Sequence, residues 1–368
     1  MTRRELPRVS ILALALTALA AGCAAPLPTT ELPPTRIVAP ALEFPDLRDY
    51  RGVIDCRFAA GGLDQVKIAE IARDAQIDFV VSGDRVKAGQ AEFGIGGYTS
   101  DVLFIPGGSF PAGGGEIVAV NLRAPTDPGK SPSDLIGAIH DQGGLAIAAE
   151  PASFRAPEDY ALADAIGVYS QRPVWAAENP TALFLRAIFF SADRFLGDLD
   201  ERPDRNLAAY DRLAAGARVT LLAGMGGAEN MAVMGSTVGT FEQLFLFYTT
   251  HLLATERTAD ALIDAIKHGH AYVSFDLMGY VSGFAFYAQN GDAKTMMGDE
   301  VQLAPGLALR AELPAAAERV ALVLNGGEVG SVRNASGLEF APKSAGAYRI
   351  EAFRNGRPWI FSNPVYVR

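Results

Sequence analysis

Short apolar runs alternate with amphipathic stretches of helix length between about residue 50 and residue 223. In the amphipathic stretches the apolar residues lie three and four positions apart, which is the period of a helix. Continuous apolar strands between helices predict a parallel sheet covered on its faces, and their number predicts a barrel. The expected strands are 52–54, 78–82, 102–105, 116–122, 145–149, 165–169 and 218–223. The expected helices are 63–75, 133–142 and 206–215.

A different pattern begins near residue 273, where short alternating segments are separated by turns. The pairs Asn325-Gly326 and Asn355-Gly356 are typical of tight hairpins. This pattern predicts a small β-sandwich over residues 273–368, with Trp359 in its core or, as the alternative, stacked on a ligand. The expected strands are 283–288, 307–313, 319–325, 328–333, 346–353 and 359–361.

The N-terminus has the pattern of an export signal. Arg3, Arg4 and Arg8 precede an apolar run over residues 9–21, which is too short to span a bilayer as a helix. Residues 19–23, Leu-Ala-Ala-Gly-Cys, resemble the bacterial lipobox, in which the cysteine is lipidated and becomes the mature N-terminus. Ala20 stands where leucine is commonest. We therefore expect lipidation at Cys23, with an ordinary secretory signal and a chance cysteine as the alternative.

Six prolines follow between residues 24 and 45 and prevent regular structure, so this stretch is expected to be a semi-extended tether. The expected division of the chain is a signal peptide over 1–22, a tether over 23–45, an α/β barrel over 46–272 and a β-sandwich over 273–368. The expected location is the bacterial cell envelope, with the protein anchored to a membrane by its N-terminal lipid and facing the periplasm or the exterior.

Composition and charge narrow the class of protein. With 368 residues, 49% of them hydrophobic and 20% charged, the chain is long and apolar enough to build a globular core. The net charge of −10 and the lack of a basic block argue against nucleic acid as a partner. Once Cys23 is lipidated, Cys56 is the only thiol, so no disulfide within the chain is expected. Cys56 itself is interpreted as a buried structural thiol.

Four segments of the first domain carry a family resemblance. Residues 50–57, 79–85, 105–107 and 142–151 resemble, in order and spacing, successive motifs of the polymerase and histidinol phosphatase (PHP) family. The resemblance extends over about residues 50 to 230. The C-terminal segments 348–351 and 358–367 resemble the β module of exported PHP-type proteins. The resemblance implies a PHP-like distorted (β/α) barrel followed by a small all-β domain.

In that family the strand ends supply histidines and carboxylates that hold up to three metal ions for phosphoester hydrolysis. This sequence departs from the pattern at most ligand positions, and its 4 histidines lie elsewhere. Ser109 stands near an expected glutamate, and the final Gly-Ser-Asp-x-His motif appears as residues 224–228 without a ligand. Only Asp84 keeps its usual type. The matching positions are Asp55 and Arg57 for His-x-His, Asp84 and Arg85 for Asp-His, Glu116 for a histidine, and Glu150 for the histidine of Ala-His-Pro.

The substitutions allow two interpretations of this degenerate site. Guanidinium groups pair with carboxylates bidentately and are never neutral, so Arg57 and Arg85 can supply the positive charge that metals otherwise bring. We therefore expect a plugged site with no cofactor. The weaker alternative is a single divalent cation on carboxylates alone, and a wrong alignment of the motifs is the third possibility. The carboxylates are Asp55, Asp84, Glu116 and Glu150.

These interpretations lead to two functional hypotheses. The first is a membrane-anchored lipoprotein whose PHP-like domain is a non-catalytic binding or scaffolding pseudoenzyme, with a protein or small-molecule partner that the sequence does not identify. The alternative is a metal-dependent phosphoesterase with a rearranged, carboxylate-based site.

The histidines are expected to be structural. His140 and His251 are placed on helices, and His268 and His270 flank Gly269 at the end of a helix with no cluster of carboxylates around them. The glycine runs at 94–97 and 113–115 lack the pattern of a phosphate-binding loop and are interpreted as turns.

Overall fold

The structure is a computed structural model, and it describes residues 37–38, 44–88, 90, 96–170, 202–227, 231–233, 236–238, 240–276 and 280–368. The expected signal peptide, the lipidation site Cys23 and almost all of the tether lie outside the described residues, as do Ala228 and the first two residues of the glycine run at 94–97. Within the described ranges, no helix combines the length and the apolar character that a membrane crossing needs.

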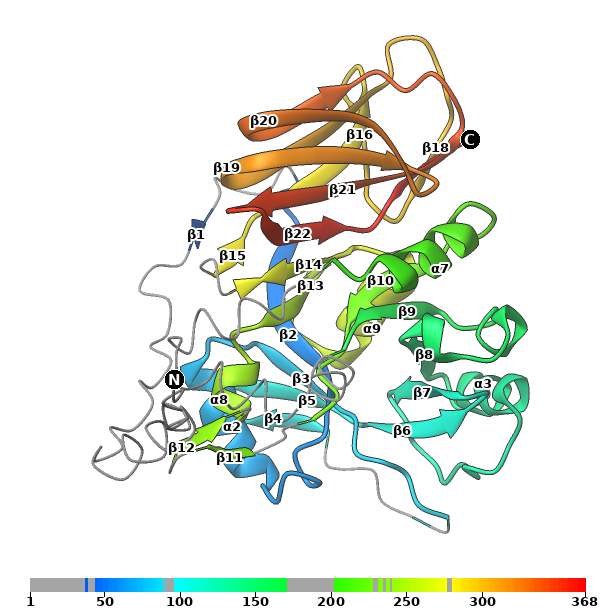
Figure 1. Cartoon of the computed structure of the whole chain (residues 1–368), viewed down its shortest axis with the longest axis vertical. Coiled ribbons are helices and arrows are strands. Elements are labelled where there is room, and N and C mark those ends of the chain that lie inside the picture. The colour runs from blue at the N-terminus through cyan, green and yellow to red at the C-terminus, as the bar shows by residue number, and fades with distance from the viewer. Residues whose placement is uncertain are drawn as a thin grey trace, which may run out of the picture.

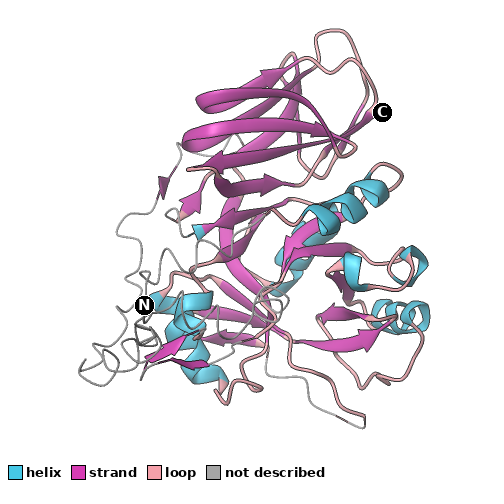
Figure 2. Ribbon diagram, viewed as in Figure 1, coloured by secondary structure: helices cyan, strands magenta, loops and turns pink. Residues whose placement is uncertain are grey.

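Strands form most of the regular structure, and the helices lie in the lower half of the molecule as drawn in Figure 2. The helices are α2 (Gln65–Asp74), α3 (Pro132–His140), α7 (Asp204–Ala214), α8 (Phe241–Leu244), α9 (Ala259–His268) and the short 3-10 turns η1 (Pro151–Ser153) and η2 (Pro157–Asp159). The strands before residue 276 are β1 (Ile37–Val38), β2 (Arg48–Cys56), β3 (Phe79–Ser82), β4 (Gly97–Thr99), β5 (Val102–Ile105), β6 (Gly107–Ala112), β7 (Gly115–Val120), β8 (Leu145–Ala149), β9 (Ala165–Tyr169), β10 (Thr220–Ala223), β11 (Met231–Val233), β12 (Ser236–Val238), β13 (Tyr248–Ala254) and β14 (Ala271–Phe275).

The lower half is a mixed α/β assembly of two large sheets and the two-stranded β11–β12 sheet (Figure 1). One sheet has the order β10-β9-β8-β7-β6, and the other contains the neighbours β14-β13-β2-β3-β5-β4. They meet at two isolated parallel bridges, Ile54 with Gly224 and Arg85 with Ser109. The α/β class agrees with the sequence analysis. A closed barrel is not established, because the described ladders form two separate sheets and β6, β7 and β8 pair antiparallel rather than parallel.

Alternate side chains of these strands enter two different cores. In β3, Phe79 and Val81 belong to the same cluster as residues of α9, whereas Val80 packs with residues of α2. The strands β7, β8 and β10 alternate in the same way, as period 2 requires. Both faces of the strands are therefore buried, which explains the continuous apolar runs in the sequence.

The upper half is built from the C-terminal strands (Figure 1). The long strand β19 pairs with β16 near its start and with β21 near its end, while β20 lies along its other edge. Two of the predicted strands, 307–313 and 319–325, are thus parts of one strand, with a register shift between Glu312 and Ala317. The strands are β15 (Val281–Ser282), β16 (Ala285–Asn290), β17 (Ala293–Met296), β18 (Glu300–Val301), β19 (Ala308–Leu324), β20 (Gly327–Phe340), β21 (Gly346–Arg354), β22 (Arg357–Ser362) and β23 (Val365–Val367).

Both predicted hairpin turns are present in this part. Asn325 and Gly326 have φ of 48° and 88°, and Asn355 and Gly356 have φ of 50° and 73°. Two successive residues with positive φ are what a tight primed turn between antiparallel strands requires, and the Asn-Gly pair supplies them at low cost. Trp359 is fully buried in the core of this half, as expected.

The two halves are continuous through β14, which pairs with β13 on one side and β22 on the other. The expected boundary between residues 272 and 273 falls inside β14, so the division of the chain into these two domains stays a prediction. Side chains also bridge the halves: the amide of Asn363 donates to the carbonyls of Leu221 and Ala271 at 2.9 and 2.8 Å.

The placement of His251 on a helix was wrong. His251 lies in the middle of β13, which pairs with β2 on one edge and β14 on the other. Two β-branched residues, Thr249 and Thr250, precede it, and a strand buried between two neighbours accommodates such side chains well. His140 at the end of α3 and His268 at the end of α9 lie where they were expected.

Candidate functional site

The residues expected to form the site lie near the ends of β2, β3 and β8 and at the start of β7. Asp55 is the penultimate residue of β2 and has φ of 60°. Two glycines pack against it: a Cβ on Gly83 would lie 2.1 Å from Asp55 Oδ1, and one on Gly224 would lie 3.5 Å from Asp55 Cβ. The backbone N–H groups of Met225 and Gly226 donate to the carbonyls of Ile54 and Asp55 at 2.8 and 3.0 Å. The backbones of Gly83 and Gly224 therefore pack directly against Asp55, because neither residue has a side chain.

The guanidinium of Arg57 occupies the centre of the site. Its Nε and Nη2 donate to the two carboxylate oxygens of Asp55 at 2.9 and 2.8 Å, and Nη2 also donates to Glu116 Oε2 at 2.6 Å. The side chains of Arg57 and Asp55 are 8% and 3% exposed. Burial alone would lower the pKa of Arg57, but the charges of Asp55 and Glu116 and the hydrogen bonds to them outweigh it and raise that pKa. Arg57 is thus a permanent buried cation between two carboxylates.

Gly227 provides the space for this side chain. It has φ of 109°, and a Cβ at this position would lie 3.1 Å from the Cβ of Arg57. Residues 224–228 correspond to the final motif of the PHP resemblance but contain no metal-binding residue. Gly227 in this segment instead leaves space for the side chain of Arg57.

Arg85 lies at the rim of the site rather than in its centre. Its side chain is 54% exposed, and Nη2 is 3.5 Å from Glu116 Oε1. The backbone of Arg85 bridges that of Ser109, whose hydroxyl is buried and has no hydrogen-bond partner among the described residues. The structure therefore brings together Asp55, Arg57, Glu116 and Arg85 in one chain of ion pairs.

Asp84 and Glu150 have other partners. Asp84 accepts hydrogen bonds from the backbone N–H groups of Ala59 and Ala60 at 3.3 and 2.9 Å, and so holds the loop after β2. Glu150 follows Ala149, which faces Glu116 across the β7–β8 ladder, and accepts from the hydroxyl of Ser153 at 3.4 Å. That these six residues derive from a metal site stays a prediction.

Cys56 is fully buried and is not a candidate nucleophile. Burial, followed by the negative charges of Asp84 and Asp55, raises the pKa of its thiol well above the usual value. The thiolate, which is the reactive form, is therefore disfavoured. This agrees with its interpretation as a structural thiol.

We tested whether the site residues fit a divalent metal ion of the kind that the PHP resemblance implies. Both oxygens of Asp55 and one oxygen of Glu116 are directed at the Arg57 guanidinium, which would repel a cation bound to the same oxygens. Across the residues that the structure describes, no group of three or more His, Cys, Asp and Glu side chains has an arrangement that could hold a metal ion. As arranged here, these residues do not fit the metal.

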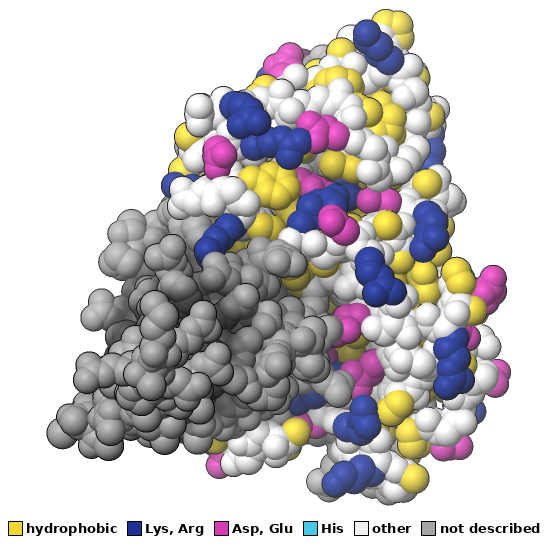
Figure 3. All heavy atoms as spheres, in the orientation of Figure 1, with side chains coloured by type: hydrophobic (Ala, Val, Ile, Leu, Met, Phe, Trp, Pro, Cys, Tyr) yellow, Lys and Arg dark blue, Asp and Glu magenta, His cyan; other side chains and the backbone are white. Residues whose placement is uncertain are grey.

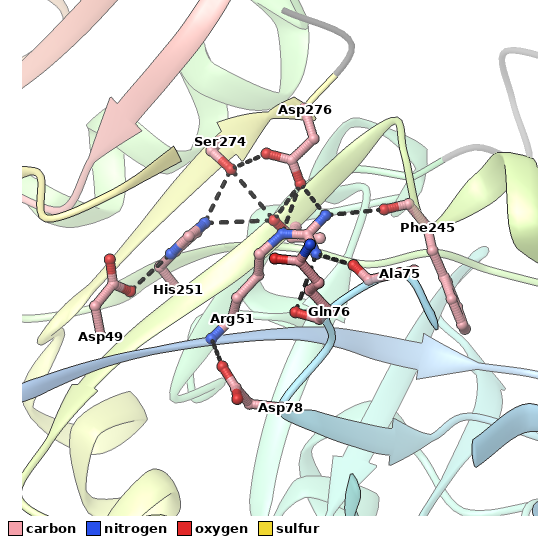
Figure 4. Close-up of polar contacts among 10 residues, drawn as sticks. Asp49, Arg51, Ala75, Gln76, Asp78, Phe245, His251, Ser274 and Asp276 are labelled. Carbon is pink, nitrogen blue, oxygen red and sulfur yellow. Dashed lines mark hydrogen bonds and ion pairs between the residues drawn. The ribbon is translucent and has the colours of Figure 1, made fainter. Parts of the chain in front are cut away.

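A second polar cluster, which the sequence analysis missed, lies at β2, β13 and β14 (Figure 4). His251 Nδ1 is 2.7 Å from Asp49 Oδ1, and His251 Nε2 is 3.0 Å from Ser274 Oγ. These are the distances of an Asp-His-Ser catalytic triad, but His251 and Ser274 are 0% exposed, so a substrate has no access to the hydroxyl. Arg51, Thr249 and Asp276 complete the cluster, which we call the His251 network.

The other histidines each contact an acidic residue. His140 Nε2 is 2.8 Å from Asp164 Oδ2, and His270 Nε2 is 3.0 Å from Asp299 Oδ2. His268 Nδ1 is 2.9 Å from the carbonyl oxygen of Asp264 and 3.4 Å from its carboxylate. His268 and His270 thus each have a single carboxylate partner rather than a cluster, and Asp299 comes from a distant part of the sequence. Each imidazole has its own partner, as a structural role requires.

A pocket of about 330 Å³ lies between α7 and the β19–β20 turn. It is lined by charged residues of α7 and by the turn residues Asn325 and Gly326. At this pocket, Arg349 donates to both oxygens of Asp211 at 2.8 Å, and Arg202 donates to Glu351 at 2.7 and 2.8 Å.

On the face drawn in Figure 3, basic and acidic side chains are interspersed and do not form one basic field.

Comparisons with known proteins find a likeness among solved structures. No protein-family model matches the sequence, and no curated protein matches it. Among solved structures, the chain is similar to a two-domain protein from Bacteroides vulgatus ATCC 8482 that contains a predicted PHP-like metal-dependent phosphoesterase. The two share 12% sequence identity and a TM-score of 0.43, over 90% of this chain and 98% of the other.

Proposed function

We propose that this protein is a non-catalytic binding or scaffolding protein of the bacterial cell envelope, with a PHP-like fold that no longer hydrolyses phosphoesters. The proposal depends on one observation, the bidentate contact of the buried Arg57 guanidinium with Asp55 and its third contact, with Glu116. Metal-dependent hydrolysis needs a cation that polarises the phosphoryl group and activates water. A guanidinium supplies charge but cannot activate a bound water in that way.

The contacts of Arg57 explain how an arginine can stably occupy the place of a metal ion. Two carboxylates this close to each other and almost fully buried would repel strongly without a cation between them. Arg57 compensates both and satisfies three of the carboxylate oxygens by hydrogen bonds. We infer that the arginine replaced the metal and retained the fold around it.

This proposal is tested by the activity of the purified full-length protein. We expect no stoichiometric Mn, Fe or Zn by elemental analysis, and no cleavage of simple phosphomonoesters above the blank with any of these ions added. The alternative, a phosphoesterase with a rearranged carboxylate site, predicts turnover that a chelator abolishes. That alternative would replace ours if the turnover disappeared in Asp84→Ala but persisted in Asp74→Ala, whose exposed carboxylate lies outside the site.

The envelope location depends on residue 23 and has its own test. In Cys23→Ser, metabolic labelling with a fatty acid should fall to background, because the serine hydroxyl does not replace the lipidated thiol. Lipoproteins carry several acyl chains, so the unaltered protein should stay in the membrane fraction. A suitable control is Cys56→Ser, which removes the other thiol and should leave the labelling intact. Persistent labelling of Cys23→Ser would show that the N-terminus is not a lipobox.

A further inference from the structure

The His251 network, drawn in Figure 4, shares no residue with the site around Arg57 and is buried. His251, Ser274 and Asp276 are each 0% exposed, and Thr249 and Arg51 are almost fully buried as well. Without access to water, every donor and acceptor must find its partner inside the network. The protonation state of His251 therefore follows from a count of the available protons.

Asp276 is ionised, because it is the carboxylate partner of the buried Arg51. Arg51 Nε and Nη2 donate to Asp276 Oδ2 at 2.9 and 2.5 Å. The remaining contacts of the guanidinium are to the carbonyl oxygens of Ala75, Gln76 and Phe245. A protonated Asp276 would leave the buried charge of Arg51 uncompensated, which is strongly unfavourable.

The two hydroxyl groups of the network donate to this carboxylate. Ser274 Oγ lies 2.7 Å from Asp276 Oδ1, and Thr249 Oγ1 lies 2.8 Å from Asp276 Oδ2. A hydroxyl has a single proton, so both are used in these contacts. His251 Nε2, at 3.0 Å from Ser274 Oγ and 3.4 Å from Thr249 Oγ1, therefore faces oxygen lone pairs and must carry a proton itself.

The other ring nitrogen of His251 also carries a proton. Nδ1 lies 2.7 Å from Asp49 Oδ1, while Asp49 Oδ2 accepts from the Tyr272 hydroxyl at 2.5 Å and the Gly283 N–H at 2.8 Å. Burial raises the pKa of Asp49, but His251, Tyr272 and Gly283 together outweigh it and lower that pKa. Burial and then Asp49 raise the pKa of Tyr272, so its hydroxyl stays a donor. Asp49 Oδ2 thus accepts two hydrogen bonds, as an ionised carboxylate does, and Oδ1 receives the Nδ1 proton.

We propose that His251 is a buried imidazolium, and that the His251 network is a proton-dependent latch that fastens the start of the C-terminal strands to β2, β13 and β14. Gly283 is the link, because its N–H binds the carboxylate that His251 neutralises. The charged groups around the ring are Asp49 and Arg51 from β2 and Asp276 after β14. With the imidazolium, two positive and two negative charges balance, and Tyr272 stacks on the ring at 4.2 Å between centroids.

Loss of one proton opens the latch when the pH rises. The Nε2 lone pair would then face the oxygen of Ser274, whose proton is held by Asp276, and the charge of Asp49 would lose its counterion. The latch is therefore closed while both ring nitrogens of His251 carry a proton, and it opens when one of these protons is lost.

The direct test is nitrogen-15 NMR of the histidine side chains in the full-length protein, which separates imidazolium from the two neutral tautomers. At about pH 7.5, the histidines of the urea-unfolded chain are mostly neutral. We expect His251 of the folded chain to show two protonated ring nitrogens at that pH. A neutral ring with a single N–H would overturn the proposal.

Hydrogen exchange at Gly283 tests the latch itself. In the unaltered protein, the exchange rate of Gly283, corrected for the intrinsic pH effect, should rise about tenfold over the pH range in which His251 loses its proton. The reason is that the buried carboxylate of Asp49, which binds the Gly283 N–H, then lacks its counterion and the closed arrangement is less stable. Asp49→Asn should show the faster rate already at neutral pH. Asp164→Asn is the matched control, because it removes the carboxylate partner of the surface residue His140. If Asp49→Asn does not fold, the measurement on the unaltered protein is sufficient. A Gly283 exchange rate that does not change when His251 loses its proton would contradict the latch.

Discussion

Replacement of Arg57 by alanine is expected to lower the free energy of unfolding by about 3–5 kcal/mol, because it leaves the buried carboxylate of Asp55 without a cation and the partly buried one of Glu116 with only the distant Arg85. Asp55 loses both of its bonds to the guanidinium, and Glu116 loses the shorter of its arginine contacts. Arg85 cannot compensate, since it is half exposed and lies 3.5 Å from Glu116. The measurement is chemical denaturation of the full-length protein at neutral pH.

Two controls separate this effect from a general cost of losing an arginine. Arg73→Ala removes an exposed partner of Asp74 and should cost about 1 kcal/mol or less. Added Mg²⁺ or Ca²⁺ should restore part of the stability of Arg57→Ala, and of that variant alone, by binding the vacated carboxylates. An Arg57→Ala protein as stable as its parent and indifferent to both ions would show that these residues do not share a buried site.

The second large effect is expected at Arg349, which joins the C-terminal strand β21 to α7. Its guanidinium donates to both oxygens of Asp211 and, at 2.6 Å, to Glu351. Arg349→Met keeps most of the apolar volume but leaves Asp211 as a buried carboxylate without its cation. We expect a loss of about 3–5 kcal/mol in the free energy of unfolding. Arg310→Met, which removes a partly exposed partner of Glu339, should cost about 1 kcal/mol or less.

The pH dependence of the same variant provides an independent check. Burial raises the pKa of Glu351, but Arg202 and Arg349 outweigh it and lower that pKa. A carboxyl group with a lowered pKa stabilises the fold above its unfolded pKa of about 4.3, and this contribution is lost as the pH falls towards the folded pKa. Arg349→Met should therefore lose less additional stability than the parent between about pH 5 and pH 3. An equal loss in both proteins would indicate that Arg349 does not stabilise the ionised Glu351.

The regular elements were the most predictable part of this fold. The expected helices 63–75, 133–142 and 206–215 correspond to α2, α3 and α7, and the buried runs at 145–149 and 165–169 are β8 and β9. Periodicity identifies such segments because one physical cause, burial of one or both faces, dominates them. It does not reveal how strands pair, and the antiparallel β6–β7–β8 ladder was therefore not foreseen.

The sequence predicted which types of residue form the candidate site, but it did not predict how these residues are arranged. Arginine and carboxylate at neighbouring strand ends indicated ion pairs, and the structure has them between Arg57, Asp55 and Glu116. The sequence could not show that Asp84 binds the backbone of the loop after β2, because that depends on the path of residues 57–62.

The His251 network was missed for a related reason. Its residues come from three separate parts of the chain, and Asp49 and His251 are 202 positions apart in the sequence. No local sequence motif therefore joins them. Its one sequence signal is a histidine beside β-branched residues, but the neighbouring Leu252 and Leu253 are compatible with the period of a helix as well as with that of a strand. A buried polar network of this kind becomes visible only when the strand order is known.

The most direct test of the proposed function is anomalous diffraction from crystals of the protein soaked in Mn²⁺. If Arg57 has replaced the metal, the electron density of its guanidinium should lie between the carboxylates of Asp55 and Glu116, with no manganese peak at either. Soaked crystals of Arg57→Ala serve as the control and should show a peak at the vacated position. A manganese peak on Asp55 or Glu116 in the unaltered protein, with Arg57 displaced, would contradict the proposal and favour a metal-dependent hydrolase.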